Sequence, residues 1–313
     1  MRKPIQRRFL ISDDVKQAFF HKKGVVALES TVITHGLPYP DNLTTARVLE
    51  DTIRKEGAIP ATIAVINGII RVGLSPNELE KLAQDKTALK LSRRDLPYAL
   101  ALQKNGGTTV ATTMMIAQQA GIRIFATGGI GGVHRGVTET FDISADLEEL
   151  GRCNVCVVCA GAKAVLDIPK TLEVLETKGV PTIAFGCDDF PAFYYRNSGE
   201  KPAYRLDSIP EITALLIQKW NLAQWPDSLH FDGGVLIGNP IEPAFEYPKK
   251  EVEKQIEQAL NEMNVTGRDV TPYLLSRLGE LSQGQSKQSN IALLKNNAAL
   301  GAQIACKLAQ ELT

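Results

Sequence analysis

The sequence predicts an α/β/α sandwich, in which helices cover both faces of a central, mostly parallel sheet and the C-terminal third adds a helical layer. Two observations predict this fold. Up to about residue 190, short runs rich in Val and Ile alternate with amphipathic helical patterns, as is typical of parallel strands that are buried on both faces. After residue 232, one further apolar run is followed by mostly helical patterns.

The individual elements follow in order along the chain. We expect strands at Gly24–Ile33, Ala61–Ile66, Ile69–Val72, Ile122–Ala126, Val155–Cys159, Thr182–Phe185 and Gly233–Gly238. Helices are expected at Asp41–Glu56 and, with a continuous apolar stripe, at Ser289–Leu312. Asn67-Gly68 predicts a two-residue hairpin turn. Ser75, with a glutamate three residues later, predicts a capped helix start.

The chain reads as one domain over residues 1–313, because no internal repeat, low-complexity tract or Gly/Ser linker divides it. The first ten residues are basic, but no apolar run of the secretory type follows them. We therefore expect residues 1–20 to form a partly disordered leader. A remnant of an organelle-targeting signal is the alternative.

Charge and cysteine usage exclude several classes of function. The 35 basic and 35 acidic residues cancel, so neither nucleic acid nor an anionic membrane is indicated as a partner. No apolar run approaches the ~20 residues that span a bilayer. Cys153, Cys156 and Cys159 lie in an expected strand, where residues three apart point to opposite faces and cannot share a metal ion. Buried thiols in a reducing cytoplasm are the better interpretation.

Two ionisable residues stand out because they adjoin buried strands. Glu29 interrupts an apolar segment, where desolvation would raise its pKa and suit it to act as a general acid. Alternatively, it closes a strand end and faces water or a base. Lys163 follows the apolar run before a helix, at an expected strand-to-helix turn. Apolar neighbours and the helix dipole would disfavour its ammonium form there, which favours a nucleophilic amine. A lysine simply exposed at a helix start is the alternative.

Two glycine- and acid-rich segments could bind the polar parts of a ligand. TGGIGGVHRG, residues 127–136, matches neither the dinucleotide nor the phosphate-loop pattern. Its backbone N–H groups, with His134 and Arg135, could still hold an oxyanion; a structural turn is the alternative. In FDISAD, Asp142, Ser144 and Asp146 alternate before a helix, which suits either a hard cation such as Mg²⁺ or Mn²⁺ or simple helix capping.

A third polar segment is KLSRRDLP, which holds Lys90, Arg93 and Arg94 beside an apolar strand. These cations could contact a phosphate or a uracil carbonyl. The competing interpretation is a solvated basic turn in which Asp95 caps the next helix.

Taken together, the motifs identify a family. ALEST, THGLPYP, KLSRRDLP, TTVATTM, ATGGIGGVHRG, TFDISADL, VCAGAK and QSNI occur in this order between Gly24 and the C-terminus. This series resembles the pseudouridine-5′-phosphate glycosidases, a family that includes the indigoidine-synthase-A-like proteins. The resemblance implies reversible cleavage of the C1′–C5 bond of pseudouridine 5′-phosphate to uracil and ribose 5-phosphate, through a lysine imine and in the carbon–oxygen lyase class.

The resemblance also implies roles for individual residues. The lysine of AGAK, Lys163, is the nucleophile, and the glutamate of ALEST, Glu29, is the proton donor. The aspartate of FDIS, Asp142, binds Mn²⁺. Substrate contacts are expected from Lys90, Val110, His134, Ser144, Ala145, Asp146 and Asn290. We hypothesise in addition that Asp146 acts as a base toward water or Lys163.

Further properties follow only from the resemblance. It suggests a homotrimer, a cytoplasmic location, and a pseudouridine kinase on a separate chain, since no kinase domain is present. Two rival interpretations stay open at this point. An aldolase-like enzyme would also form a lysine imine, and a non-catalytic binding protein for nucleotide sugars could have kept the pocket. A role in pigment synthesis is conceivable from the family name.

Overall fold

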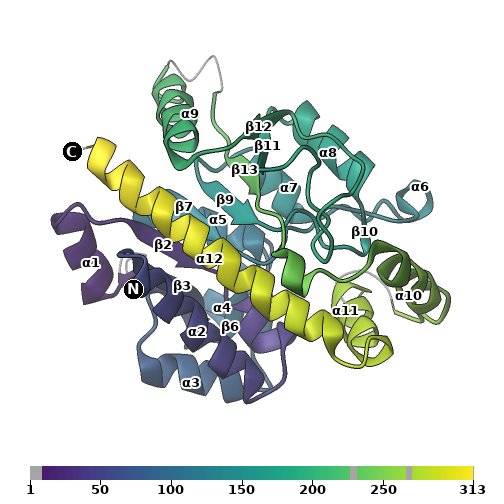
Figure 1. Ribbon diagram of the computed structural model, residues 1–313. Coiled ribbons are helices and arrows are strands. Elements are labelled where there is room, and N and C mark those ends of the chain that lie inside the picture. The colour runs from purple at the N-terminus through teal and green to yellow at the C-terminus, as the bar shows by residue number, and fades with distance from the viewer. Residues whose placement is uncertain (1–8, 226–230, 266–269, 313) are drawn as a thin grey trace.

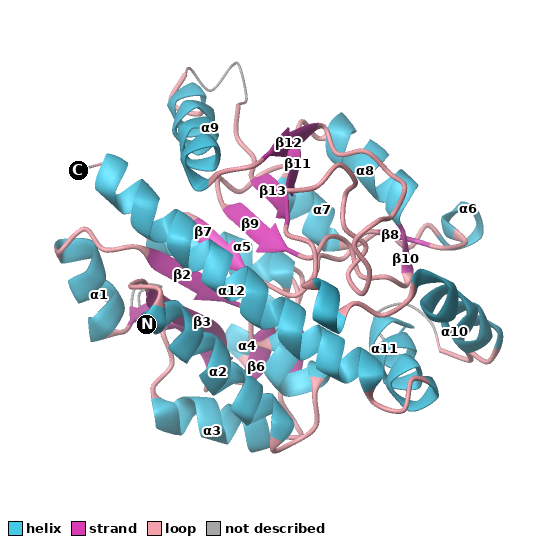
Figure 2. Cartoon of the chain, in the orientation of Figure 1, coloured by secondary structure: helices cyan, strands magenta, loops and turns pink. Residues whose placement is uncertain are grey.

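The computed structural model of the protein describes residues 9–225, 231–265 and 270–312, and its centre is one large sheet (Figure 2). The strands of this sheet are β1 (Phe9–Ile11), β2 (Val25–Leu28), β3 (Ile59–Ile66), β4 (Ile69–Val72), β5 (Leu89–Leu91), β6 (Gly106–Thr108), β7 (Ile124–Ala126), β9 (Cys156–Cys159), β11 (Thr182–Phe185), β12 (Tyr204–Leu206) and β13 (Val235–Gly238). A separate two-stranded ribbon consists of β8 (Val133–His134) and β10 (Leu166–Asp167).

The order of the main sheet is β1-β4-β3-β2-β7-β9-β13-β11-β12, with β6 paired to β3 and β5 to β6. Within the described residues, every pair is parallel except β3–β4 and β3–β6. The four central strands β2, β7, β9 and β13 are buried along their whole length. The mostly parallel sheet that the sequence predicts is thus confirmed.

Helices lie on both faces of this sheet. They are α1 (Asp13–Phe20), η2 (Val32–Gly36), α2 (Asp41–Lys55), α3 (Pro76–Gln84), α4 (Leu96–Ala101), α5 (Val110–Ala120), α6 (Val137–Thr140), α7 (Ala145–Leu150), α8 (Ile168–Thr177), α9 (Ile209–Leu222), η4 (Pro243–Phe245), α10 (Lys249–Asn261), α11 (Val270–Leu281) and α12 (Gln285–Glu311). No helix among the described residues is long and apolar enough to span a bilayer.

Figure 1 shows α12 running across one face of the sheet, over β2, β7 and β9, with α2 beside it. Helices α5, α7 and α8 lie behind the sheet in this view and pack on the other face. The approach of α12 is close: a Cβ atom on Gly24 would lie 2.6 Å from the backbone carbonyl carbon of Ala305. This contact requires a glycine at the start of β2, because any side chain there would push the helix away.

Several local predictions are confirmed, with shifted ends. The Asn67-Gly68 hairpin joins β3 to β4 in antiparallel register, with Ile66 opposite Ile69. The Ser75 capping box is complete, because its hydroxyl accepts from the Glu78 N–H and the Glu78 carboxylate accepts from the Ser75 N–H. The long C-terminal helix starts four residues earlier than predicted, after Gly284.

The N-terminal part differs in detail from two expectations. Within the partly disordered leader expected at residues 1–20, residues 9–20 are ordered: β1 adds to the edge of the sheet beside β4, and Ser12 caps α1, which buries Val15 and Ala18. Residues 1–8 lie outside the described residues. The strand expected at Gly24–Ile33 ends at Leu28, because the Ser30 hydroxyl donates to the Ile63 carbonyl and the chain then turns into the π-helix η2.

Candidate active site

A cavity of about 1070 Å³ lies at the carboxyl ends of the central strands, where open α/β sheets bind their ligands. Parallel pairing of β2, β7 and β9 brings the loops that follow these strands to one edge. The cavity is lined by every residue to which the sequence analysis assigns a role from the resemblance, namely Glu29, Lys90, Val110, His134, Asp142, Ser144, Ala145, Asp146, Lys163 and Asn290. Arg135, the other candidate for holding an oxyanion, lies instead at a second cavity.

Glu29 is the first residue after β2, and its carboxylate accepts a hydrogen bond from the hydroxyl of Thr127, the first residue after β7. Burial raises the pKa of Glu29 above its usual 4.5, while the nearby positive charge of Lys163 acts in the opposite direction. A carboxyl group in this state can hold a proton closer to neutral pH than an exposed glutamate, as a general acid requires.

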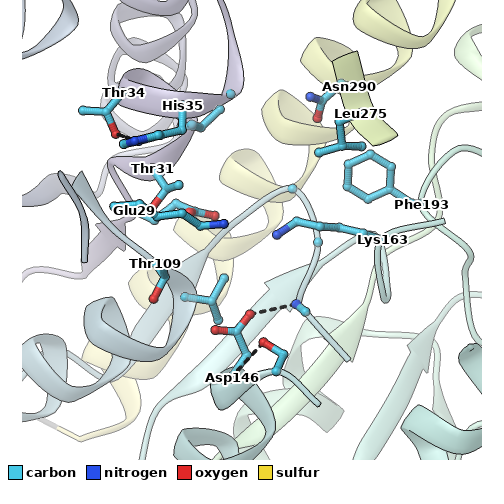
Figure 3. Close-up of a pocket in the computed structure, with 18 of the residues that line it drawn as sticks. Glu29, Thr31, Thr34, His35, Thr109, Asp146, Lys163, Phe193, Leu275 and Asn290 are labelled. Atoms are coloured by element: carbon cyan, nitrogen blue, oxygen red, sulfur yellow. Dashed lines mark hydrogen bonds between the residues drawn. The ribbon is translucent and has the colours of Figure 1, made fainter. Parts of the chain in front are cut away.

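Lys163 follows β9 and extends into the cavity toward Glu29 (Figure 3). The sequence analysis expected Lys163 to lie at the start of a helix, but no helix begins there. The strand β10 separates it from α8, which starts only at Ile168. Its backbone is held instead by the glycine-rich loop, since the Lys163 N–H donates to the Ile130 carbonyl at 3.1 Å. The helix-dipole part of the reasoning for Lys163 is therefore wrong, and the structure places Lys163 beside Glu29 instead.

Asp146 is buried and holds two other segments of the cavity wall in place. One carboxylate oxygen accepts from the Ala111 N–H at 2.9 Å, and the other accepts from the Gly131 N–H at 2.8 Å. Ser144 caps α7, because its hydroxyl accepts from the Asp146 N–H at 3.2 Å. The capping alternative for Ser144 is thus confirmed, and both side chains are already engaged by backbone groups (Figure 3).

His134 and Asp142 form the part of the cavity that could hold a metal ion. Their Nδ1 and Oδ2 atoms lie 3.8 Å apart. Burial lowers the pKa of His134, and the charges of Lys163 and Lys90 lower it further against the effect of Asp142. No group of three or more His, Cys, Asp or Glu side chains converges within the described residues. At this place Asp142 would offer a divalent cation one carboxylate, and water or substrate would have to supply its other ligands.

The first turn of α5 borders the cavity, and its Ala111 and Thr112 N–H groups already donate to Asp146 and Thr109. Thr109 caps the helix through its hydroxyl, and Val110, its first residue, is buried at the cavity wall. Lys90 comes from β5, which pairs with β6 just before this helix. A helix N-terminus beside a lysine favours an anionic group.

The three cations of KLSRRDLP have separate positions. Lys90 and Arg94 line the cavity. Arg93 also borders it, but its guanidinium forms a two-pronged ion pair with Glu149 of α7, whose side chain has no exposed surface. Asp95 binds the N–H of Ser92 at 3.0 Å instead of capping α4. The segment therefore joins the cavity wall and is not merely a solvated turn.

The sequence analysis missed the wall opposite the strand ends. We call this the helical wall; it comprises Thr31, Val32, Thr34, His35, Leu275, Ser276, Gly279, Ser286, Lys287 and Asn290. Figure 3 shows His35 and Asn290 on this side, with Leu275 beside Phe193. Only Asn290 was anticipated, through the QSNI motif. The THGLPYP motif was a usable signal for Thr34 and His35, whereas nothing local distinguishes Leu275.

The buried cysteines are as the sequence analysis expected. Cys156 and Cys159 are wholly buried on β9, and Cys153 is buried just before it. Burial raises the pKa of the Cys153 and Cys159 thiols to about 12. They are therefore protonated and unreactive at neutral pH.

Comparison with known proteins shows which family the chain belongs to. The family model of indigoidine synthase A like proteins matches residues 14–307. A pseudouridine-5′-phosphate glycosidase from Solibacter usitatus is 57% identical, with 95% of this chain and 98% of that protein covered.

Two solved structures have the same fold over 99% of both chains. An indigoidine synthase A-like protein from Thermotoga maritima is 31% identical with a TM-score of 0.87. The prealnumycin C-glycosynthase AlnA, solved in complex with ribulose 5-phosphate, is 35% identical with a TM-score of 0.88. The full-length match, the fold and the cavity all lead to one conclusion: the chain belongs to the family of indigoidine synthase A like proteins.

Proposed function

We propose that the protein is a pseudouridine-5′-phosphate glycosidase that cleaves its substrate reversibly to uracil and ribose 5-phosphate. The observation that carries this function is the pairing of Lys163 and Glu29 in one cavity, beyond the ends of β9 and β2, the two parallel strands that flank β7. The relatives support the substrate class, because those at about half identity or more are named for this activity. The complex of AlnA with a pentose phosphate supports it further.

The bond to be broken explains why an amine is needed. Uracil is joined to ribose through carbon, so protonating a leaving oxygen, as ordinary glycosidases do, does not release it. A nitrogen bonded to C1′ can supply the electron pair that expels the base. A lysine imine is the expected intermediate of such chemistry.

The reaction then balances in three steps. The C1′–O4′ bond breaks as O4′ takes a proton, and the Lys163 nitrogen bonds to C1′ and loses a proton. Next, C5 of uracil is protonated. The lone pair of the nitrogen then forms the C=N bond of the imine, and the electron pair of the C1′–C5 bond returns to the uracil ring. Water finally adds to C1′ and releases ribose 5-phosphate and the free amine.

Glu29 is the proton carrier that the cavity supports best, because its pKa is raised and it faces the amine. It would protonate O4′ or C5 and would then regain a proton from the Lys163 nitrogen. Asp146 is the second candidate, as base for water or for Lys163. Its two backbone hydrogen bonds leave only the remaining lone pairs of its oxygens for this role.

The phosphate of the substrate would bind where backbone donors and cations meet. Support comes from Lys90, from Val110 at the start of α5, and from Ser144 and Ala145 at the start of α7, all of which border the cavity. His134 and Asn290 would contact the sugar or the base from the ribbon and from α12.

Mn²⁺ would be held by Asp142, and when bound it would supply positive charge for water and phosphate oxygens. Metal dependence is testable in solution. After chelation, added Mn²⁺ should bind the wild type and restore its activity, whereas Asp142→Asn should bind Mn²⁺ weakly in a calorimetric titration. Equal Mn²⁺ affinity of the two proteins would remove Asp142 as the ligand.

The remaining properties rest on the family resemblance. We include in the proposal a homotrimeric state, a cytoplasmic location, membership of the carbon–oxygen lyase class, and a separate pseudouridine kinase that supplies the phosphorylated substrate. Sedimentation of the purified protein tests the trimer; a monomer at micromolar concentration would contradict it.

The activity itself is tested by incubating the protein with pseudouridine 5′-phosphate and measuring uracil and ribose 5-phosphate. We expect both products in equal amounts, and much slower release from unphosphorylated pseudouridine. An aldolase-like enzyme would release no uracil, and a binding protein would titrate the substrate in calorimetry without converting it. Either result would contradict the proposed function.

A further inference from the structure

A group of polar side chains outside the cavity contacts the backbone next to Lys163. Arg135 follows His134 at the end of the ribbon strand β8. One nitrogen of its guanidinium donates to the carbonyl of Ala164 at 3.2 Å and to the carboxylate of Glu253 at 2.9 Å. The other oxygen of Glu253 accepts from the Tyr195 hydroxyl at 2.8 Å.

These contacts join three segments that are far apart in sequence. Glu253 belongs to α10, Arg135 to the ribbon, and Tyr195 to the segment that passes beside the loop of Lys163. Within that segment, Phe193 donates its N–H to the Ala160 carbonyl at 2.8 Å. The carboxylate of Glu253 thus links Arg135 and Tyr195, which come from two segments beside the loop of residues 160–166.

The polar contacts lie where the loop meets an open hollow. This second cavity, of about 340 Å³, is lined by Arg135, Leu166, Tyr195 and Glu253 among others. The side chains of Ala164 and Leu166 are buried in the core. The bond from Arg135 to the Ala164 carbonyl adds a restraint on the backbone itself, from the side of the hollow.

The position of the Lys163 amine depends on this backbone. A lysine side chain is a flexible four-carbon stem, so its amine is only as well aimed as the Cα atom that carries it. Nucleophilic attack requires the reacting atoms at about 3–3.5 Å, and a displacement of about 1 Å that originates far from the chemistry can cost about 100-fold in rate.

We infer that Arg135, held by Glu253 and Tyr195, is a positioning residue that fixes the backbone of the loop carrying Lys163. The inference rests on the proposed function, because it assumes that Lys163 is the nucleophile. His134 is the last residue of β8, and Arg135 is the first residue of the turn that follows it. His134 lines the active-site cavity, whereas Arg135 lines the second cavity and binds the loop from there.

The test compares Arg135→Leu with wild type in two assays: uracil release, and the rate at which borohydride traps ribose 5-phosphate on the protein. We expect kcat and the trapping rate to fall together by about 10–100-fold, with KM changed less than about threefold. Arg135→Lys, which keeps the charge and one donor, should recover part of both rates. Arg205→Leu, which breaks exposed ion pairs with Asp188 and Asp207 far from the cavity, is the matched control and should behave as wild type.

The outcomes separate the inference from the proposed function. If wild type itself releases no uracil and forms no trapped adduct, the proposed function fails. If wild type is active and Arg135→Leu traps the sugar at the wild-type rate, the positioning role is overturned. A rise in KM with unchanged kcat would overturn it as well. Should Arg135→Leu not fold, Glu253→Gln and Tyr195→Phe take its place, each with a smaller expected loss of kcat.

Discussion

The two walls of the active-site cavity are built differently. On the strand-end wall, which carries Glu29, the loop 127–132 and Lys163, the backbone is hydrogen-bonded between neighbouring loops. Ala160 donates to Gly128, Ile130 to Gly161, and Lys163 to Ile130, at 2.9–3.1 Å. The helical wall is formed by separate helical segments, η2, α11 and the start of α12.

This difference teaches where accuracy is needed. Groups that exchange protons or form covalent bonds must be placed within fractions of an ångström, and the backbone network of the strand-end wall provides that. The helical wall, with Leu275 beside Phe193, can serve shape and apolar contact with less accurate placement (Figure 3). Changes in the first wall should therefore affect kcat, and changes in the second should affect KM.

The largest effect is expected from Lys163→Ala on the strand-end wall. Losing the nucleophile should lower uracil release on the order of 10⁴-fold or more, as in other enzymes that act through a covalent intermediate. Lys170→Ala, an exposed lysine of α8, is the matched control and should keep full activity. Uracil release by Lys163→Ala at more than a tenth of the wild-type rate would contradict the role of Lys163 as the nucleophile on the strand-end wall.

Glu29→Gln should lower kcat by about 10²–10⁴-fold, which is the range for losing a general acid. The amide can still accept from the Thr127 hydroxyl, so the fold should be kept. The alkaline limb of the pH–rate profile, where a general acid loses its proton, should change together with the rate. An unchanged profile would mean that another group is the proton carrier.

Although Glu29→Gln should lower activity, it should raise the stability of the folded protein. Burial raises the pKa of Glu29 in the folded protein above its usual 4.5, so the wild type loses stability as pH rises from 4.5 through the folded pKa. Glu29→Gln does not titrate. Its free energy of unfolding should exceed that of wild type at pH 8, and the excess should disappear near pH 4. Urea denaturation at both pH values measures this; an excess that grows toward low pH would contradict the raised pKa.

A pair of glycines tests how tightly each wall is packed. A Cβ on Gly131 would meet the Ser144 hydroxyl at 2.2 Å and the Asp146 carboxylate at 2.8 Å, so Gly131→Ala should destabilise the protein by about 1–3 kcal/mol and lower kcat. On the helical wall, nothing lies within 4 Å of such an atom at Gly279 in α11. Gly279→Ala should stabilise the helix by up to about 1 kcal/mol. Equal thermal shifts for the two variants would contradict the comparison.

Leu275→Ala should have the smallest effect. The side chain is half-buried beside Phe193 and offers apolar contact worth about 1 kcal/mol. We expect KM to rise about fivefold and kcat to stay within a factor of two. Steady-state kinetics with pseudouridine 5′-phosphate measures both; a fall in kcat at constant KM would mean that the helical wall takes part in catalysis.

The sequence predicted the strand-end wall far better than the helical wall, for physical reasons. Buried parallel strands are continuous apolar runs, so β7, β9, β11 and β13 could be located to within a few residues. Glu29 and Lys163 stood out because ionisable groups beside such runs are costly. Motif resemblance supplied Val110 and Asn290, which no local pattern distinguishes.

Other features depend on contacts that are distant in sequence. The end of β2 is set by the bond from Ser30 to Ile63, 33 residues away, which no local pattern of the VVALESTVI segment reveals. Leu275 reaches the cavity only through the packing of α11 against α10 and α12. The pairing of Arg93 with buried Glu149 spans 56 residues. Periodicity and motifs carry no information on such pairings.

The most direct test of the account is mass spectrometry of the protein after treatment with ribose 5-phosphate and borohydride. Lys163 is the only position at which we expect the reduced sugar phosphate, and the peptide that contains it should gain that mass in the wild type. Lys163→Ala should gain none. A modified peptide that lacks Lys163, or an unmodified protein that nevertheless releases uracil at the full rate, would contradict the covalent role of this residue.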